Sequence, residues 1–523
     1  MSTIILEGLD IELLALVVSH LDGLSRPVVA FVCRRFREAA RRERASRNLP
    51  VCHTPTFFLQ HAYIRRLIEA RLPDLVRWVC SMGCTMPRKA CTLIATMGDL
   101  DLFVWARTEK GCPWDCDTTM EAATHGHLPI LAWARANDCP WYDDSIVQKA
   151  AEHGHLDVAI WAHAHGCRLG WATTAVAARG GHLHVVEWAH GQGVQPCAYA
   201  CDEAARGGHV AVLRWMRGKG YPWDTGVCSG LALVGNLDAL RWARSEGCPW
   251  SAWTCGMAAL GGHLHVLQWA RDNGCEWDKR TCRYAARGGH MDVLKWAREN
   301  GCPWDGKTCR AAVEGNHLDV LLWARTNGCA WSDKHKREVC DNAAWRGNVD
   351  MMRYLVAEEA CPLSWWEAKT AARHGRIDAL VWMCNHGVQL CSEIIETAAC
   401  CGHIRLIEWM RAHGCPWDER TCSAAAGSGR VDVLAWLRAN GCPWDERTCA
   451  SAAQGGHLDV LEWAHANGCP LSALARLINY NQSEDVLAWL DAHDCPHGES
   501  WTIEEDVDDD DEQQSSHAMA VDD

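Results

Sequence analysis

Apolar and polar positions along most of this chain repeat one short helical pattern. In residues 278–302, two apolar stripes have helical spacing: Cys282, Ala285 and Ala286, then Met291, Leu294 and Ala297. Asp278 before the first stripe is a good N-cap residue, and Gly288 and Gly289 between the stripes tolerate the left-handed backbone that ends a helix. Gly301 ends the second helix in the same way. The pattern therefore predicts a pair of short helices.

This helical pair recurs with a period of mostly 27 residues. The tryptophan of the second helix marks each copy, and Tyr354 takes its place once. The marked positions are Trp78, Trp105, Trp133, Trp161, Trp188, Trp215, Trp242, Trp269, Trp296, Trp323, Tyr354, Trp382, Trp409, Trp436, Trp463 and Trp489, which makes 16 units. A period between 20 and 50 residues is typical of solenoids, in which each unit is stable only when stacked on its neighbours. We expect an all-α solenoid of about 16 helical hairpins.

The composition is rich in cysteine and tryptophan, with 31 and 30 residues, so a metal or redox site has to be considered. The cysteine that closes most units is replaced by Val194, Tyr221 and Val388 in others, and the tryptophan of the Pro-Trp step by Leu169 or Leu390. Because an apolar residue cannot replace a ligand, both positions are predicted to be core. Equivalent positions in stacked helices lie about 8–10 Å apart, too far for a disulfide. The adjacent pair at positions 400 and 401 is the best candidate for oxidation. Abundant free thiols favour a reducing compartment.

A histidine follows the glycine between the two helices in nine units: His127, His155, His182, His209, His263, His290, His317, His403 and His457. Asp99, Asn236 and Arg376 take the same position elsewhere, so we predict a hydrogen-bonding residue at the start of the helix. Histidines of successive units lie about 10 Å apart and cannot bind one metal ion together. Nucleophile-elbow and zinc-protease motifs do not occur. We expect no enzyme, no catalytic residues, no metal and no cofactor.

The segment TCRYAARGGHMDVLKWARENGC, residues 281–302, resembles the ankyrin repeat. The corresponding positions are Thr281, Ala285, Ala286, Gly289, His290, Val293, Leu294 and Gly301. Two departures are the Cys in place of the Pro that usually follows the Thr, and a period of 27 in place of 33 residues. The resemblance extends over roughly residues 73–497 and implies ankyrin-like hairpins with the β-hairpin fingers shortened to turns.

Residues 1–50 do not follow the repeat and contain two short amphipathic helical stripes. They resemble the F-box, with the ending VCRRFR as the most specific part and Asp10 in place of the usual Pro. The resemblance implies that Skp1 of cullin-RING ubiquitin ligases binds Leu9, Leu13, Leu14, Val17, Leu21, Val32, Cys33 and Phe36. A plain N-terminal cap of the solenoid is the alternative. An F-box joined to short Trp-rich ankyrin-like repeats is similar to protein families of giant DNA viruses of amoebae.

Charge and hydropathy limit the remaining partners. The tail 504–523 holds ten acidic residues and no Lys or Arg, and without it the formal charge falls from −15 to −5. The mildly acidic remainder of the chain argues against nucleic acid as the main ligand. No apolar run is long enough for a membrane helix. The tail is predicted to stay unfolded and solubilising, or to recruit a basic partner. We expect a cytoplasmic protein, in the host cytoplasm if viral.

The expected domains are an F-box-like domain at 1–50, a connecting helical segment at 51–72, the solenoid at 73–500 and the acidic tail at 501–523. Because stacking uses the repeated positions, a target should contact those that vary, the two residues before the Ala pair. The candidates are Gln148, Lys149, Asp202, Glu203, Arg283, Tyr284, Asp341 and Asn342. A longer loop at 332–336 is either a binding projection or a tolerated insertion.

The pattern and the two resemblances together favour a substrate-recruiting adaptor of a Skp1-cullin-F-box ubiquitin ligase, with the solenoid binding an unidentified protein target. The alternative is a scaffold that sequesters its partner without a ligase. A metal or redox protein is the third class, and stoichiometric metal in purified material would be its signature.

Overall fold

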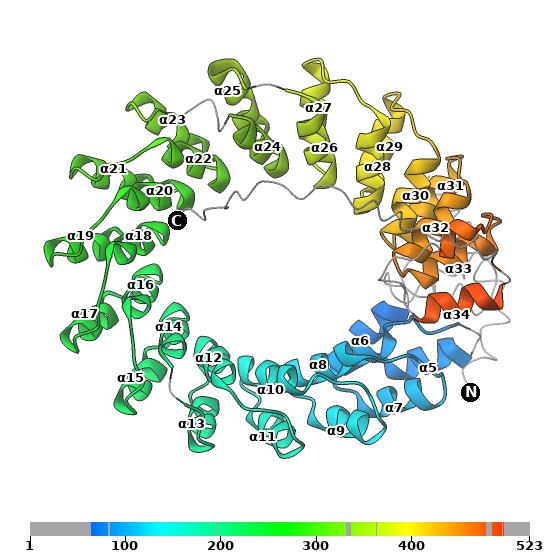
Figure 1. The fold of residues 1–523 in the computed structure, drawn as a ribbon, viewed down its shortest axis with the longest axis horizontal. Helices are drawn as coiled ribbons and strands as arrows, with labels where there is room; N and C mark the ends of the chain where they lie inside the picture. Colours follow the sequence, from blue (N-terminus) through cyan, green and yellow to red (C-terminus); the bar gives the residue numbers. More distant parts are fainter. Residues whose placement is uncertain are drawn as a thin grey trace, which may run out of the picture. The chain divides into compact units, whose positions relative to one another are not determined.

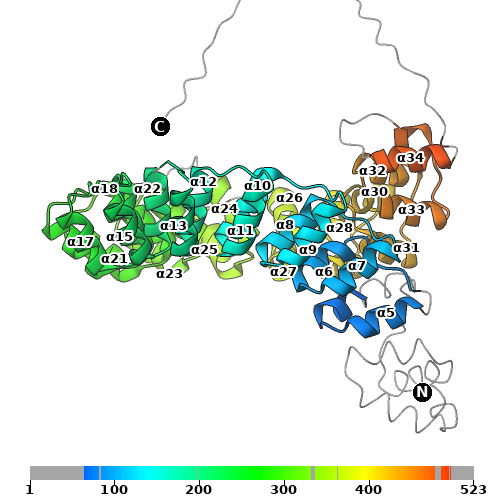
Figure 2. The same cartoon turned by 90° about the horizontal axis from the view of Figure 1, so that it is seen from below.

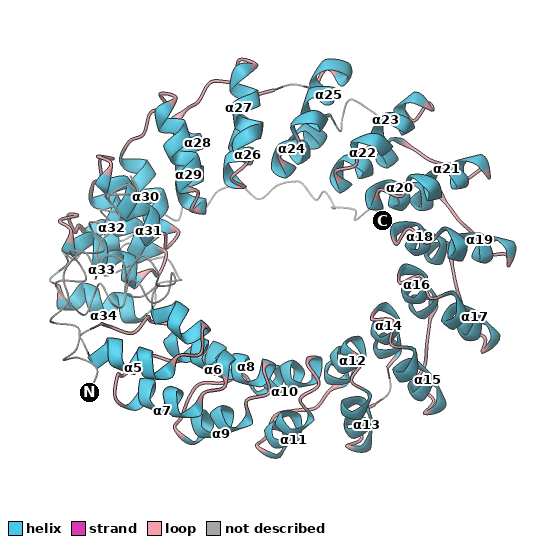
Figure 3. Cartoon of the chain, turned by 180° about the vertical axis from the view of Figure 1, so that it is seen from behind, coloured by secondary structure: helices cyan, strands magenta, loops and turns pink. Residues whose placement is uncertain are grey.

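The computed structural model describes residues 64–81, 84–195, 197–330, 336–361, 363–476, 484–493 and 495. Throughout this part the secondary structure is helical, and no strand occurs in it (Figure 3). Short helices alternate along the chain as hairpins (Figure 1). The prediction of an all-α helical-hairpin solenoid is confirmed. The F-box-like residues, the loop 332–335 and the acidic tail lie outside the described residues.

Each hairpin has a first and a second helix. The first helices are α6 (Ala90–Met97), α8 (Cys116–Thr124), α10 (Asp143–Glu152), α12 (Trp171–Gly180), α14 (Ala198–Arg206), α16 (Thr225–Leu233), α18 (Ala252–Leu260), α20 (Lys279–Gly288), α22 (Gly306–Gly315), α24 (Lys336–Arg346), α26 (Trp365–Arg373), α28 (Ser392–Cys401), α30 (Glu419–Gly427), α32 (Glu446–Gln454) and the 3₁₀ turn η2 (Ala473–Arg476). The second helices are α5 (Pro73–Ser81), α7 (Leu100–Thr108), α9 (Leu128–Ala136), α11 (Leu156–Ala164), α13 (Leu183–Gly191), α15 (Val210–Gly218), α17 (Leu237–Ser245), α19 (Leu264–Asp272), α21 (Met291–Glu299), α23 (Leu318–Thr326), α25 (Val349–Glu359), α27 (Ile377–Asn385), α29 (Ile404–Ala412), α31 (Val431–Ala439), α33 (Leu458–Ala466) and α34 (Glu484–Ala492).

Local capping explains why these helices begin and end where they do. Asp278 is the N-cap of α20, and its side chain accepts a hydrogen bond from the backbone N–H of Arg280 at 2.8 Å. Gly289 ends α20 in the left-handed region, with φ 77°. Gly301 follows α21 with φ 83°. The predicted cap and both predicted stops are confirmed.

The chain divides into two units, residues 1–394 with 408–414, and residues 395–407 with 415–523. In the first unit, first helices of consecutive hairpins pack closely on one another, and second helices are more widely separated. The first helices lie on the inner side of that unit's curve (Figure 1), and the hairpins from α8 to α26 stand in a single layer in the perpendicular view (Figure 2). Small side chains such as Cys282, Ala285 and Ala286 permit this close approach, and all three are fully buried.

Where a hairpin closes with a cysteine, that cysteine connects the end of the hairpin to its beginning. The Cys302 thiol donates to the carbonyl of Asp278, the N-cap residue 24 positions earlier, at 3.4 Å. Cys275 and Cys329 make the same contact with residues 251 and 305, each at 3.3 Å. These cysteines are buried and free. The prediction that the closing position belongs to the core is confirmed.

The tryptophan of the Pro-Trp step is half-buried and packs against the edge of the core, as Trp114 and Trp141 do, so the prediction that it is core is correct only in part. Arg271 explains its environment, because its guanidinium lies 4.3 Å from the centre of the Trp277 ring and donates to the Cys275 carbonyl at 2.6 Å. The Trp277 ring also meets Trp296 of the next second helix edge-on at 5.7 Å. The arginine therefore covers one face of the ring, while the ring links two repeats.

The interhelix histidines do form hydrogen bonds, but not as caps of their own helices. His290 makes no side-chain cap bond, and its Nε2 lies 3.0 Å from the carbonyl oxygen of Leu260 in the preceding repeat. Residues 127, 155, 182 and 263 make the same contact at 3.1–3.2 Å. Asn236 instead caps its own helix, accepting from Ala239 at 3.0 Å. The histidine at this position therefore connects repeats, a role that the sequence prediction did not contain.

Candidate functional site

The first helices expose one side along their length, which we call the variable stripe. It comprises the positions with spacing i, i+3, i+4 and i+7 that avoid the Cys and Ala-Ala core positions. On α20 these are Arg280, Arg283, Tyr284 and Arg287. All eight target-binding candidates from the sequence lie on variable stripes, on α10, α14, α20 and α24. The stripe position one turn earlier on each helix, such as Arg280 on α20, was not among the target-binding candidates.

The structure brings Tyr284 into an aromatic cluster with a residue that the sequence prediction missed. Its ring meets Trp253 on α18 edge-on at 5.4 Å, and the Arg280 guanidinium lies 5.5 Å from the centre of the Trp253 ring. Tyr284 packs over Gly256, where an added Cβ would lie 3.1 Å from the ring. A bulky residue at 256 would displace Tyr284, so the glycine holds this cluster in place.

A second aromatic cluster surrounds Asp341. Trp366 on α26 donates its indole N–H to the Asp341 carboxylate at 3.0 Å, and the Thr370 hydroxyl lies 3.4 Å from the other oxygen. Trp365 and Trp366 are 46% and 47% exposed. Exposed tryptophans held by hydrogen bonds are typical of protein-binding hot spots. Asn342 beside them is half-buried.

A third cluster contains exposed aromatic residues beside an acidic pair. Trp171 and Tyr199, 57% and 50% exposed, meet edge-on at 5.7 Å between α12 and α14. One turn beyond Tyr199, Asp202 is half-buried, whereas Glu203 is only 5% exposed and lies 3.6 Å from Arg179. Glu203 therefore offers little surface to a partner.

The remaining two candidates lie on α10 without an aromatic neighbour among the described ring contacts. Lys149 is paired with Glu152 at 2.9 Å, and Gln148 is half-buried beside it. The aromatic clusters thus involve Trp171, Tyr199, Trp253, Trp365 and Trp366, none of which the sequence prediction named. Their signal was present, because they vary between units on the same helix side as the chosen residues.

The ionised carboxylate of Asp202 destabilises the folded state. Burial and the facing carboxylate of Asp224 raise its pKa to about 7, while Gly226 leaves the space into which the carboxylate fits. One oxygen of Asp202 is buried without a hydrogen-bond partner. A native pKa above the unfolded value means that the folded state is favoured at low pH, and that this stability is lost as pH rises toward 7.

We therefore expect Asp202→Asn to stabilise the protein by about 2 kcal/mol at pH 8 and to have little effect near pH 4. The full shift corresponds to about 4 kcal/mol, which partial exposure reduces. Thermal unfolding followed by circular dichroism at both pH values measures the difference. Asp292→Asn, at an exposed position on α21, is the control and should change neither midpoint. Equal effects of Asp202→Asn at the two pH values would contradict the assignment.

Cysteine pairs within single repeats are another feature that sequence reasoning missed, since only neighbouring repeats were compared. In five repeats the thiol of the first helix donates to the backbone carbonyl of the closing cysteine at 3.6–3.9 Å: 91 to 112, 228 to 248, 282 to 302, 309 to 329, and 449 to 469. The hydrogen bond to Cys302, followed by burial, raises the pKa of Cys282. The first-helix thiols are therefore held protonated, as suits a packing role.

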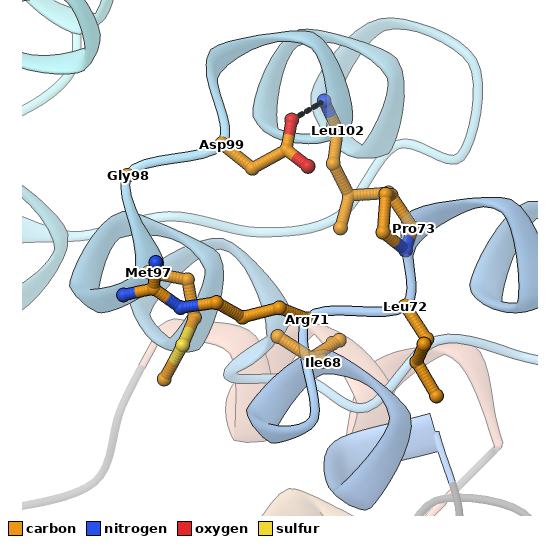
Figure 4. Close-up of a pocket in the computed structure, with 8 residues that line it drawn as sticks. All are labelled: Ile68, Arg71, Leu72, Pro73, Met97, Gly98, Asp99 and Leu102. Carbon is orange, nitrogen blue, oxygen red and sulfur yellow. Dashed lines mark hydrogen bonds between the residues drawn. The ribbon is translucent and has the colours of Figure 1, made fainter.

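A small cavity of about 260 Å³ lies at the N-terminal end of the described array (Figure 4). Its lining residues are Ile68, Arg71, Leu72, Pro73, Met97, Gly98, Asp99 and Leu102. The Asp99 carboxylate accepts a hydrogen bond from the backbone N–H of Leu102 at 2.9 Å and caps α7. The acidic side chain of the cavity therefore serves as a helix cap.

Two other kinds of site were sought in the described residues. No group of three or more His, Cys, Asp or Glu side chains there is arranged to hold a metal ion. None of the helices described has the length and apolar character needed to cross a membrane.

The geometry defines the class to which the described part belongs. It is a helical-repeat solenoid whose variable stripes present clustered aromatic residues. A model of the F-box domain matches residues 6–46, which include all eight residues expected to bind Skp1. No curated protein matches the chain.

Similar solved structures are also helical-repeat proteins. The pentatricopeptide repeat protein PPR10 from maize matches with 14% identity and a TM-score of 0.28, over 93% of this chain and 84% of that chain. PPR10 in complex with an 18-nt psaJ RNA element matches with the same identity and TM-score, over 84% of each chain. Values this low support no inference about ligands.

Proposed function

We propose that this protein is a non-enzymatic adaptor that joins a protein target to a Skp1-cullin-F-box ubiquitin ligase. The F-box match at residues 6–46 is the observation that carries the ligase half of the proposal. The exposed aromatic clusters of the variable stripes support the target-binding half, because aromatic anchors dominate protein interfaces. We further propose that the hairpins are shortened ankyrin-like repeats, and that the protein acts in a reducing cytoplasm, as in proteins of giant viruses.

The partner class follows from the same surface. Exposed rings such as Trp171 and Trp365 can bury large apolar area against a protein, and acidic positions such as Asp202 and Asp341 lie beside other rings. We propose a protein partner and no nucleic acid for the solenoid as a whole. A scaffold that sequesters the target without a ligase is the alternative function, and the F-box match favours the adaptor over it.

Capture of Skp1 tests the adaptor. We expect tagged full-length protein to retain purified Skp1, and Leu13→Ala with Leu14→Ala to weaken retention more than about tenfold, because such apolar anchors each contribute about 1–2 kcal/mol or more. The control replaces Leu322 and Leu487 by Ala, two leucines that are each 39% exposed and lie outside the matched segment. Retention that is absent from the parent, or unchanged in the Leu13 and Leu14 variant, would leave residues 1–50 as a cap and the protein as a scaffold.

A further inference from the structure

Positive charge is concentrated on α20. The segment Lys279–Gly288 contains four basic residues and no acidic one, although the chain as a whole is acidic. Lys279 is paired with Asp305 at 3.1 Å and Arg280 with Asp278 at 2.8 Å. Half of this charge is therefore neutralised by neighbouring carboxylates.

The other half is available to a ligand. Arg283 and Arg287 make no ion pair with any residue that the structure describes; Arg287 is exposed and Arg283 is half-buried. They are four residues apart on one helix, so their backbones lie about 6 Å apart on the same face. Alternate side chains of an extended strand are separated by about 6.6 Å. Two carboxylates at alternating positions of an extended peptide thus match the spacing of the two guanidinium groups.

An apolar contact lies beside these arginines. Tyr284 is between them in the sequence and packs edge-on against Trp253, over Gly256. Because Gly256 leaves no side chain under the Tyr284 ring, the two rings are held together at the α18–α20 boundary. A ligand that reaches both arginines with its carboxylates can place an apolar side chain against these rings.

The cationic region is short. On α22, Lys307 is exposed, whereas Arg310 is already paired with Glu314 at 2.7 Å and with Glu338 at 2.5 Å. In the opposite direction, the stripes of α16 and α18 carry no charge, and on the α14 stripe Arg206 accompanies Asp202 and Glu203. A nucleic-acid strand needs many successive cationic contacts, so this surface favours a short acidic segment over a phosphate backbone.

From these contacts we infer that Arg283, Arg287 and the Trp253–Tyr284 pair bind an extended acidic segment of the protein target, with acidic residues at alternating positions and an apolar or aromatic residue nearby. Bidentate guanidinium–carboxylate hydrogen bonds supply the orientation. The two aromatic rings supply the apolar contact. The inference rests on the proposed function, since it names the chemistry of the segment that the adaptor recognises.

The test is fluorescence anisotropy of full-length protein with a labelled peptide that carries a Glu-Ser-Glu step and one Trp. We expect saturable binding that weakens with added salt, and a loss of about tenfold or more in affinity for Arg283→Ala with Arg287→Ala. Replacing both arginines by Lys should restore part of the affinity, which separates charge from misfolding. Lys295→Ala, at an exposed lysine of α21 in the same hairpin, is the matched control and should bind like the parent.

Three results would overturn the inference: no binding of the acidic peptide, equal binding by the double Ala variant, or tighter binding of a labelled uridine decamer than of the peptide. A peptide with Lys in place of Glu should not bind. Skp1 capture is measured on the same preparations. If capture persists while the peptide fails, only the inference about the acidic segment is lost. If peptide binding persists while capture fails, only the ligase role is lost.

Discussion

Gly262→Ala is expected to destabilise the first unit by about 3 kcal/mol, while Gly274→Ala in the next turn of the same hairpin costs about 1 kcal/mol. Both glycines have a left-handed backbone, with φ 76° and 82°, so each substitution brings the strain of an alanine in that region. They differ in surroundings. A Cβ at 262 would lie closer than 3.0 Å to the His290 ring, and at 274 it would meet nothing within 4 Å.

The additional cost at 262 comes from moving the imidazole. The ring would lose its hydrogen bond to Leu260, worth about 1 kcal/mol, and part of its packing against the preceding repeat. Thermal unfolding by circular dichroism, with hydrogen exchange of the amides of α18 to α21, measures both the overall and the local loss. Equal losses for the two variants would show that backbone strain alone matters.

A second substitution isolates the histidine further. Asn236 stands in the same relation to Gly208 as His290 does to Gly262, in the following repeat. A Cβ added at 208 would meet only Val234, at 3.9 Å. His290→Asn should therefore reduce the cost of Gly262→Ala toward that of Gly274→Ala. A double-mutant cycle gives the coupling free energy between residues 262 and 290, and a coupling near zero would refute the contact.

In the Asp202→Asn background, acidification from pH 7.5 to 5.5 is expected to lower the unfolding midpoint by several degrees through the interhelix histidines. Burial lowers the pKa values of His127, His182 and His263 below their usual range. Above the unfolded value of about 6.5 both states are neutral and nothing is lost. Below it the unfolded chain binds protons that the folded protein resists, so stability falls as the pH falls.

The control has to remove the opposite contribution of Asp202, whose raised pKa stabilises the fold on acidification. The measurement is therefore made in the Asp202→Asn background. There, changing the three histidines to Asn should flatten the dependence of the unfolding midpoint on pH. The Nε2–H donor is present in both charge states, so the cost arises from burying the imidazolium, not from breaking the bond. A pH dependence that survives the triple substitution would place its origin elsewhere.

The surface that we propose for target binding could be predicted only in part. The two positions before the Ala pair were correct as members of the variable stripe, because helical periodicity assigns them to one face. The contact between Tyr284 and Trp253 could not be predicted, since it joins residues 31 apart through the packing of α18 on α20. Likewise, the burial of Glu203 depends on Arg179 and the neighbouring helix. The identity of a single residue cannot show which side chains of the neighbouring helix it will contact.

What the sequence by itself determined is the local structure: the 27-residue period, the hairpins, the Asp278 cap and the glycine at 289 that ends α20. These depend on contacts within a few residues, where propensity and capping act directly. What only the tertiary structure decided are contacts 20 to 31 residues apart: His290 with Leu260, Cys282 with Cys302, and the aromatic pair beside Arg283. They exist because stacking brings each repeat against the one before, and the distance between stacked helices is set by packing.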